Sequence, residues 1–295
     1  MGKLRWIDSH THVCAYNRDG TKREDILPPL LDVLDSSGWD LRFIIDGLDS
    51  MDFISRMTQE GARDIHEVNG FVHDLVQRAP DRLYGSCIVN PHFLDESLEA
   101  MHDCFGRWGF VKLGEMVQYA MKYQMNSDGL EGILRLAAHY DVPVQVHIST
   151  SNVGQGPGCG VEQLIDLFGA VERVPEAKYI LAHFVGTHKD DPPVVDGYLD
   201  AIEERYGRWP DNFWAEIADF NSPGVKSALK RVPLTRLIAG TDWTTHIGPP
   251  FLPYGIQHDV GTGSTPIWLN PYPPSVDALV DFLRESGARY ADIPL

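Results

Sequence analysis

The stretch that decides the fold is the apolar run Leu4-Arg5-Trp6-Ile7 followed by Asp8-Ser9-His10-Thr11-His12. The apolar run predicts a first β-strand, and side chains two residues apart in a strand project to the same face. His10 and His12 therefore point together at the end of this strand, with room for one metal ion between their imidazole nitrogens. A single His-x-His pair is equally compatible with two polar residues in a turn, so the rest of the chain must decide between them.

The composition is that of a globular enzyme and excludes some partners. The chain has 295 residues, 43% of them hydrophobic, and a formal net charge of −17. Such an acidic surface repels phosphate backbones and anionic lipid, so we expect neither nucleic acid nor a membrane as a partner. A small-molecule substrate, even an anionic one, is compatible because an enclosed metal site sets its own local field.

Cysteine usage and hydropathy predict a cytoplasmic protein. Cys14, Cys87, Cys104 and Cys159 show no Cys-x-x-Cys spacing, which argues against a zinc ribbon or a disulfide framework and fits a reducing compartment. No apolar run of signal-peptide type stands at the start, and none of about 18 residues occurs anywhere.

Short apolar runs alternate with longer amphipathic stretches along the chain, the pattern of βα units around a parallel sheet. After a first strand that ends at His10, the expected strands are 41–45, 83–89, 110–115, 142–148, 179–184, 212–220 and 236–240. Helix-length segments separate them, and a barrel of about 250 residues is a standard single-domain solution. We therefore predict an α/β fold, one (β/α)8 TIM barrel over 1–295, with a proline- and aromatic-rich excursion at about 244–274.

Polar residues cluster where the predicted strands end, which is where such barrels carry their chemistry. Besides His10 and His12, these residues are Glu115, His147, His183 and Asp242. Each has a plain alternative, since a lone strand-end histidine is often a hydrogen-bonded loop residue and a carboxylate can cap a turn. Their coincidence at several strand ends is what favours a metal site.

Four motifs resemble the amidohydrolase superfamily. They are 7–12 (IDSHTH), 146–147 (VH), 181–186 (LAHFVG) and 238–243 (IAGTDW). The branch that looks nearest contains aminocarboxymuconate semialdehyde decarboxylase and related aromatic acid decarboxylases. The resemblance implies that His10, His12, His147 and Asp242 bind metal, that His183 binds a second metal or acts as acid/base, and that Asp242 takes part in proton transfer. Superfamily members often form homodimers or larger assemblies, so a homo-oligomer stays open.

Glu115 departs from the decarboxylase-like pattern, because Lys112-Leu113 is followed here by Gly114-Glu115. The Gly-Glu ending resembles superfamily members in which a fourth-strand carboxylate bridges two metals. In a regular strand Lys112 and Glu115 cannot both face the lumen, and a carboxylated Lys112 is the alternative bridge. We expect Glu115 either to bridge two divalent ions (zinc, iron or manganese) or to contact substrate or cap the following segment.

Weaker candidates surround this set. His92, His188 and His246 are expected to be loop residues or to lie behind the ligands, and Asp219, at the end of the seventh expected strand, is a minor candidate for orienting His183 or contacting substrate. The aromatic residues of the late stretch could line a substrate pocket or pack on the barrel; they are Trp243, Tyr254, Trp268 and Tyr272.

Three reactions fit the predicted site. The first is hydrolysis of a small-molecule amide, ester or lactone by metal-activated hydroxide, with Asp242 or His183 moving the proton. The second is non-oxidative decarboxylation of a small carboxylic acid at a single metal, for which no bridging carboxylate is needed. The third is oxygenation by two irons held by four histidines and two carboxylates. Glu115 favours the first and third over the second.

Overall fold

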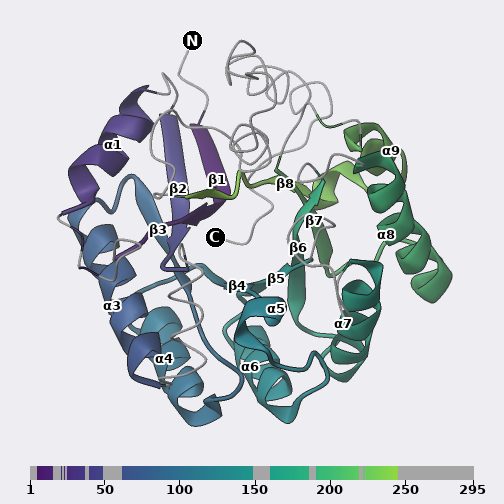
Figure 1. Ribbon diagram of the computed structural model, residues 1–295, viewed down its shortest axis with the longest axis horizontal. Coiled ribbons are helices and arrows are strands. Elements are labelled where there is room, and N and C mark those ends of the chain that lie inside the picture. Colours follow the sequence, from purple (N-terminus) through teal and green to yellow (C-terminus); the bar gives the residue numbers. More distant parts are fainter. Residues whose placement is uncertain are drawn as a thin grey trace.

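A computed structural model describes residues 5–15, 21, 23, 25–36, 40–48, 62–148, 160–185, 191–218, 222 and 224–244. Its parallel strands form the inner ring of a nearly closed barrel, and the helices form the outer ring (Figure 1). The strands are β1 (Arg5–His12), β2 (Asp40–Asp46), β3 (Leu83–Cys87), β4 (Lys112–Met116), β5 (Pro143–His147), β6 (Lys178–Val185), β7 (Phe213–Ile217), β8 (Leu237–Ala239) and β9 (Trp243–Thr244).

Helices connect successive strands, as a parallel barrel requires. They are α1 (Leu27–Ser36), α3 (Ala62–Arg78), α4 (Leu94–Gly106), α5 (Gln118–Met121), α6 (Asp128–His139), α7 (Val161–Arg173), α8 (Asp191–Tyr206) and α9 (Val225–Arg231). The (β/α)8 prediction is thus confirmed. The short helix α5 lies between β4 and α6, and the predicted excursion from residue 245 onward lies outside the described residues.

Helix α6 shows how the local sequence makes these elements. The Ser127 hydroxyl accepts a hydrogen bond from the Leu130 amide (3.3 Å) and so caps the helix. The buried positions Leu130, Ile133, Leu134 and Ala137 recur at helical spacing and face the strands. The same division operates on β5, where Val144 joins the core between strands and helices while Gln145 turns into the lumen.

The first strand is longer than predicted. It continues to His12 because Thr11 and His12 pair with Ile45 and Asp46 of β2, after a register shift that begins at Asp8. The prediction that it ends at His10 is therefore wrong by two residues. The extension puts both histidines on the strand itself and not in a turn.

Hydrogen bonds between β1 and the segment after β8 close the barrel. Ser9 Oγ donates to the Ala239 carbonyl (2.7 Å), and the Asp8 carboxylate accepts from Thr241 N (2.9 Å) and Thr241 Oγ1 (2.5 Å). Strand β9 then pairs with the end of β1. This closure carries Asp242 to the histidines at the end of β1.

Two further expectations concern the described part of the chain. Cys14, Cys87 and Cys104 are buried and not in disulfide bonds, while Cys159 lies outside the described residues. None of the described helices combines the length and the apolar character needed to cross a bilayer.

Candidate metal centre

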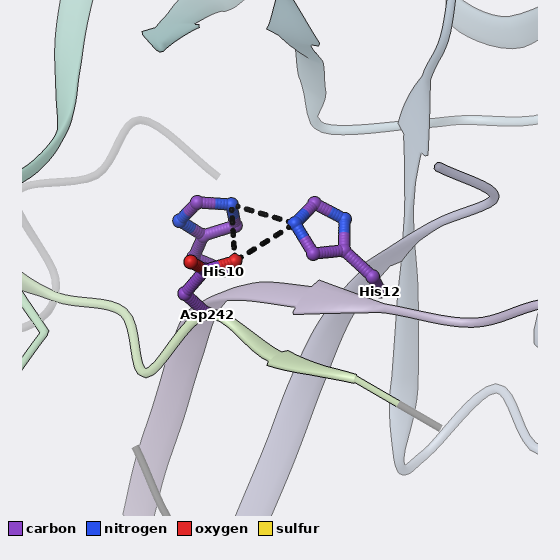
Figure 2. A group of neighbouring side chains, drawn as sticks. All are labelled: His10, His12 and Asp242. Carbon is purple, nitrogen blue, oxygen red and sulfur yellow. Dashed lines mark hydrogen bonds and ion pairs between the residues drawn. The ribbon is translucent and has the colours of Figure 1, made fainter. Parts of the chain in front are cut away.

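The first ligand group consists of His10 and His12 from β1 and Asp242 from the β8–β9 connection (Figure 2). The two Nε2 atoms are 3.0 Å apart, and Asp242 Oδ1 lies 3.0 Å from His12 Nε2 and 3.5 Å from His10 Nε2. Asp242 has a positive φ of 55°, a conformation that the hydrogen bonds of the preceding Thr241 to Asp8 help to hold. Three donor atoms from two distant segments thus converge on one point.

The second ligand group consists of Glu115 from β4, His147 from β5 and His183 from β6. Glu115 Oε1 lies 2.7 Å from His147 Nδ1 and 3.0 Å from His183 Nε2, and these two nitrogens are 3.0 Å apart. All three residues are buried. The structure therefore brings all six predicted ligands together, in two groups of three.

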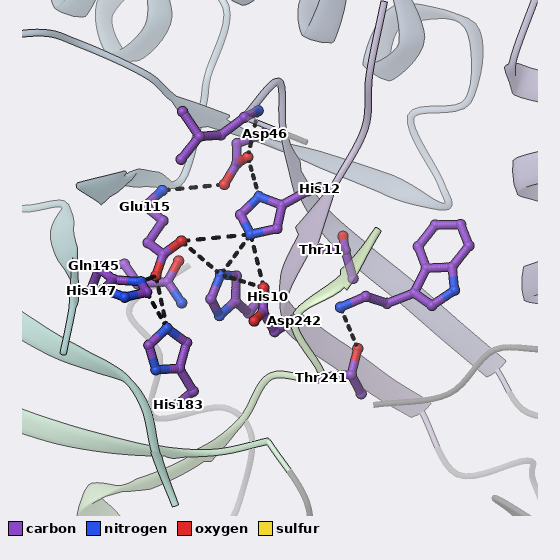
Figure 3. Close-up of polar contacts among 12 residues, drawn as sticks. His10, Thr11, His12, Asp46, Glu115, Gln145, His147, His183, Thr241 and Asp242 are labelled. Carbon is purple, nitrogen blue, oxygen red and sulfur yellow. Dashed lines mark hydrogen bonds and ion pairs between the residues drawn. The ribbon is translucent and has the colours of Figure 1, made fainter. Parts of the chain in front are cut away.

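Glu115 belongs to the second group, but its side chain extends toward the first (Figure 3). One carboxylate oxygen faces each group. Its Oε1 contacts His147 and His183, and its Oε2 lies 3.6 Å from the Nε2 atoms of both His10 and His12. This is the placement of a carboxylate that could span two ions. That the six residues bind metal stays a prediction.

An irregularity in strand β4 decides which of the side chains of Lys112 and Glu115 faces the barrel lumen. Its register shifts between Leu113 and Met116, and Gly114 has a φ of +101°, which suits glycine. Both Lys112 and Glu115 consequently face the lumen, so the expectation that only one of them could is wrong. Lys112 Nζ donates to the Ser9 carbonyl (2.8 Å) and to Gln145 Oε1, leaving Glu115 as the residue that contacts the histidines.

Two carboxylates that sequence reasoning missed orient the histidines of the first group. Glu216 Oε1 lies 2.7 Å from His10 Nδ1, and Asp46 Oδ1 lies 2.6 Å from His12 Nδ1. Carboxylate–histidine pairs of this kind hold the ring and direct its other nitrogen at a metal. The available signal was that Asp46 ends the apolar strand β2, and that Glu216 lies inside the apolar strand β7.

The positions of the ring protons on His10 and His12 show that this centre fits a divalent ion. An ionised carboxylate only accepts hydrogen bonds, so the rings of His10 and His12 carry their protons on Nδ1. When both rings are neutral, two Nε2 lone pairs face each other at 3.0 Å, which is repulsive unless a cation lies between them. Ligands about 2.0–2.1 Å from a tetrahedral ion are roughly 3.3 Å apart, which matches this spacing. The residues present therefore fit a divalent metal.

The pKa shifts in the metal-free site also show that its carboxylates stabilise nearby positive charge. Burial acts to lower the pKa of His10, but neighbouring carboxylates, Glu216 foremost, outweigh it and raise the pKa to about 10. Burial acts to raise the pKa of Glu115, yet His147 and His10 hold it well below its usual range. For Asp242 burial is likewise outweighed by His10, and its pKa is lowered. Glu115 and Asp242 are thus ionised and attract cations.

The weaker candidates divide between loop residues and positions outside the described chain. His92 lies in the turn between β3 and α4, as expected, and its Nε2 is 3.0 Å from the carbonyl of Met121, the last residue of α5. Trp243 is buried, and its ring stacks on Phe43 with centroids 5.8 Å apart, so it packs on the barrel. The candidates that fall outside the described residues are His188, Asp219, His246, Tyr254, Trp268 and Tyr272.

Tyr123, in the segment between α5 and α6, is another residue that the sequence gave no reason to select. Its side chain is buried and its hydroxyl has no hydrogen-bond partner among the described residues. Burial raises its pKa, and the charge of Glu115 adds to the shift, so the phenol stays protonated beside the centre. A hydrogen-bond donor is thus available close to the second ligand group.

Known proteins resemble this chain in family and in fold. The family model described as Amidohydrolase matches residues 7–282. No curated protein sequence matches the chain. Solved structures share the fold at low sequence identity.

The 2,6-dihydroxybenzoate decarboxylase from Rhizobium has a TM-score of 0.57 and 15% identity, over 82% of this chain and 88% of that one. The 4-oxalomesaconate hydratase from Rhodopseudomonas palustris has a TM-score of 0.58 and 14% identity, over 95% and 98%. A dihydroxybenzoic acid decarboxylase from Polaromonas, with bound manganese and the inhibitor 2-nitroresorcinol, has a TM-score of 0.53 and 14% identity, over 82% and 86%. The family match, which spans nearly the whole chain and both ligand groups, shows that the chain belongs to the amidohydrolase family.

Proposed function

We propose that this chain is a metal-dependent enzyme that holds two divalent ions, one at each ligand group, and acts on a small molecule. The observation that carries this proposal is the position of Glu115, whose two oxygens face the two groups separately. Two cations close together repel strongly, so a two-ion centre needs an anion between them. Glu115 supplies that anion without chemical modification.

The charge of the buried site supports two ions. Among the described residues, the acidic side chains that are buried, or nearly so in the case of Asp242, are Asp8, Asp46, Glu115, Glu216 and Asp242, and the buried lysine is Lys112. With the histidines neutral, as they must be to bind metal, these five carboxylates and one ammonium group carry a formal net charge of −4. Unpaired buried charge is strongly unfavourable, and two divalent ions would neutralise this set.

The residues around the ions would handle the proton. Bound divalent ions would supply Lewis-acid polarisation of a substrate oxygen and a more acidic water. Asp242 is ionised, and its side chain, at 13% exposure, is the most accessible of the ligands, so it can take up a proton from the substrate side. His183 Nδ1 is buried without a hydrogen-bond partner among the described residues; with Nε2 on an ion it would carry the ring proton and could donate a hydrogen bond to substrate.

Among reaction classes, the comparisons favour non-oxidative decarboxylation over the hydrolysis that we expected first. Two of the similar structures are named as decarboxylases of hydroxylated benzoic acids, and one of them contains manganese. Such a reaction needs an acid that protonates the carbon left by CO₂, and we assign that role to Asp242, because Nε2 of His183 would be bound to the second ion. A small carboxylic acid is the substrate class that follows.

Hydrolysis is the second candidate, and Glu115 is the observation that favours it. A bridge between two ions is not needed to hold a substrate carboxylate at one ion, whereas two-ion centres are common in metal-assisted hydrolysis. On this alternative Asp242 accepts the proton of the attacking water.

Elemental analysis of protein purified without added metal tests the proposal. We expect close to two equivalents of a divalent metal in the wild-type protein, and at least one fewer in Glu115→Gln, because a neutral amide bridges poorly. No bound metal in the wild type would contradict the proposal, and full metal content in Glu115→Gln would contradict the bridge. CO₂ release from hydroxybenzoic acids, compared with cleavage of lactones and esters, then separates the two reactions. Two irons with a visible absorption band would instead indicate O₂ chemistry.

A further inference from the structure

Glu216 contacts both ligand groups with one oxygen atom. Its Oε1 lies 2.7 Å from Nδ1 of His10 in the first group and accepts the backbone amide of His183, 2.9 Å away, in the second. His183 has a positive φ of 36°, an uncommon conformation for a residue with a side chain, so its amide needs a firm partner. A single carboxylate therefore orients a ligand ring of one group and the backbone of a ligand in the other.

The second oxygen of Glu216 is held from the opposite side by a chain of buried polar groups. Lys112 Nζ donates to Gln145 Oε1, and Gln145 Nε2 donates to Glu216 Oε2 over 2.5 Å. Because an ammonium group can only donate, the amide oxygen of Gln145 must face Lys112 and its NH₂ must face Glu216. The orientation of Glu216 is thus determined through Gln145 by Lys112, which the Ser9 carbonyl anchors (2.8 Å).

The backbone around Glu216 leaves space for this carboxylate and for little else. A Cβ atom at Gly240 would lie 2.6 Å from His10 Cβ and 2.7 Å from the Glu216 carboxylate. Glu216, Gln145 and Lys112 are each at most 1% exposed. The three side chains are thus closed off from bulk solvent and depend on one another for their hydrogen bonds.

We propose that Glu216 is a positioning residue that sets the geometry of both metal sites at once, and that Lys112 and Gln145 hold its carboxylate in place. The inference rests on the two-ion function proposed above. It assigns Lys112 a role that differs from a bridging ligand: it is the cation that orients the shared carboxylate. Asp46 acts in parallel, since Oδ1 contacts His12 Nδ1 and Oδ2 accepts the Glu115 amide (3.2 Å).

The direct test replaces Glu216 by glutamine and measures the affinity for Zn²⁺ at each site by calorimetry. In Glu216→Gln the new NH₂ group opposes that of Gln145, and turning Gln145 over would place its NH₂ against Lys112. We expect both ions to bind roughly 10- to 100-fold more weakly, the effect typical of removing a carboxylate behind a metal ligand. Loss at the His10 site alone would overturn the claim that Glu216 serves both groups. Glu172→Gln, at an exposed ion pair with Arg205, is the matched control and should bind Zn²⁺ like the wild type.

A reciprocal exchange separates positioning from structural support. The double variant Gln145→Glu/Glu216→Gln keeps the same set of side chains and restores the donor–acceptor order from Lys112 through residue 216, but it moves the charge away from His10. We expect thermal stability of the metal-free protein to recover while Zn²⁺ affinity stays at least tenfold below wild type. Recovery of both would overturn the proposal.

A measurement on the wild-type protein covers the case in which these variants do not fold. Nitrogen-15 NMR of His10 should show a proton on Nδ1, hydrogen-bonded to Glu216, in both the metal-free and the Zn²⁺-loaded protein. An unprotonated Nδ1 in either state would overturn the inference. If the wild type bound no Zn²⁺, the proposed function would fail, and the metal-free spectrum would still decide whether Glu216 holds the His10 ring.

Discussion

Metal affinity should rise with pH, because an ion must displace protons that the metal-free site already holds. Burial opposes protonation of His10, but the carboxylates around it raise its pKa to about 10, so the ring keeps an extra proton through the neutral range. Each displaced proton changes affinity about tenfold per pH unit, or about 1.4 kcal/mol. From about pH 6.5 to 8.5, His10 alone should therefore tighten binding at the first group roughly 100-fold, about 2.7 kcal/mol. Burial also opposes protonation of His12, but Asp46 outweighs it and raises that pKa, which should bring the slope closer to two protons.

Calorimetric titration with Zn²⁺ in two buffers of different ionisation enthalpy counts these protons. We expect one to two to be released per ion at the first group near pH 8. An affinity that levels off above about pH 7 with no proton release would refute the reasoning, since an ordinary histidine pKa is about 6.5. The stability of the metal-free fold depends on pH in the opposite direction: it falls, and does not rise, as pH increases. The raised pKa of His10 stabilises it fully below about pH 6.5, and this contribution is lost as pH approaches 10.

Three substitutions probe other parts of the structure. Replacing His10 and His12 together by alanine should abolish metal binding at the first group and leave a folded protein by circular dichroism; retention of full stoichiometry would count against the ligand assignment. Tyr123→Phe removes a buried hydroxyl without a hydrogen-bond partner among the described residues, so it should raise the unfolding free energy by about 1 kcal/mol. Tyr179→Phe is the control: the Tyr179 hydroxyl donates to a carbonyl at 2.9 Å, so its removal should lower the unfolding free energy. Gly240→Ala should lower the unfolding free energy by about 1–3 kcal/mol in urea titrations, because the new Cβ meets fixed atoms at 2.6 Å; a neutral effect would show that the β8 segment can move.

The fold and the six converging residues could be predicted because each depends on local pattern. Apolar runs of strand length mark β1 to β8, and the ligands stand at or just past strand ends, where a parallel barrel gathers them by topology alone. His10 and His12 followed from the two-residue period of a strand. Their convergence with Asp242 followed from barrel closure, which any sequence of eight βα units implies.

What could not be predicted depends on irregularity and on pairs distant in the sequence. The shift of register at Gly114 breaks the alternation rule, so the joint inward placement of Lys112 and Glu115 has no signature in residue order. Glu216 pairs with His10 across 206 positions; its place inside the apolar strand β7 suggests that it is buried but does not identify its partner. Which carboxylate orients which histidine is decided by packing in the lumen, and only the folded chain specifies that.

The separation of the ligands along the chain imposes an order in time during synthesis. The second group is complete in sequence at His183, whereas the first waits for Asp242, 59 residues later (242 − 183). At about 5–20 residues per second, a ribosome takes roughly 3–12 s to add those residues. A nascent chain therefore carries all of Glu115, His147 and His183 while the pair on β1 still lacks its carboxylate. The group that opens the sequence is the last to be completed.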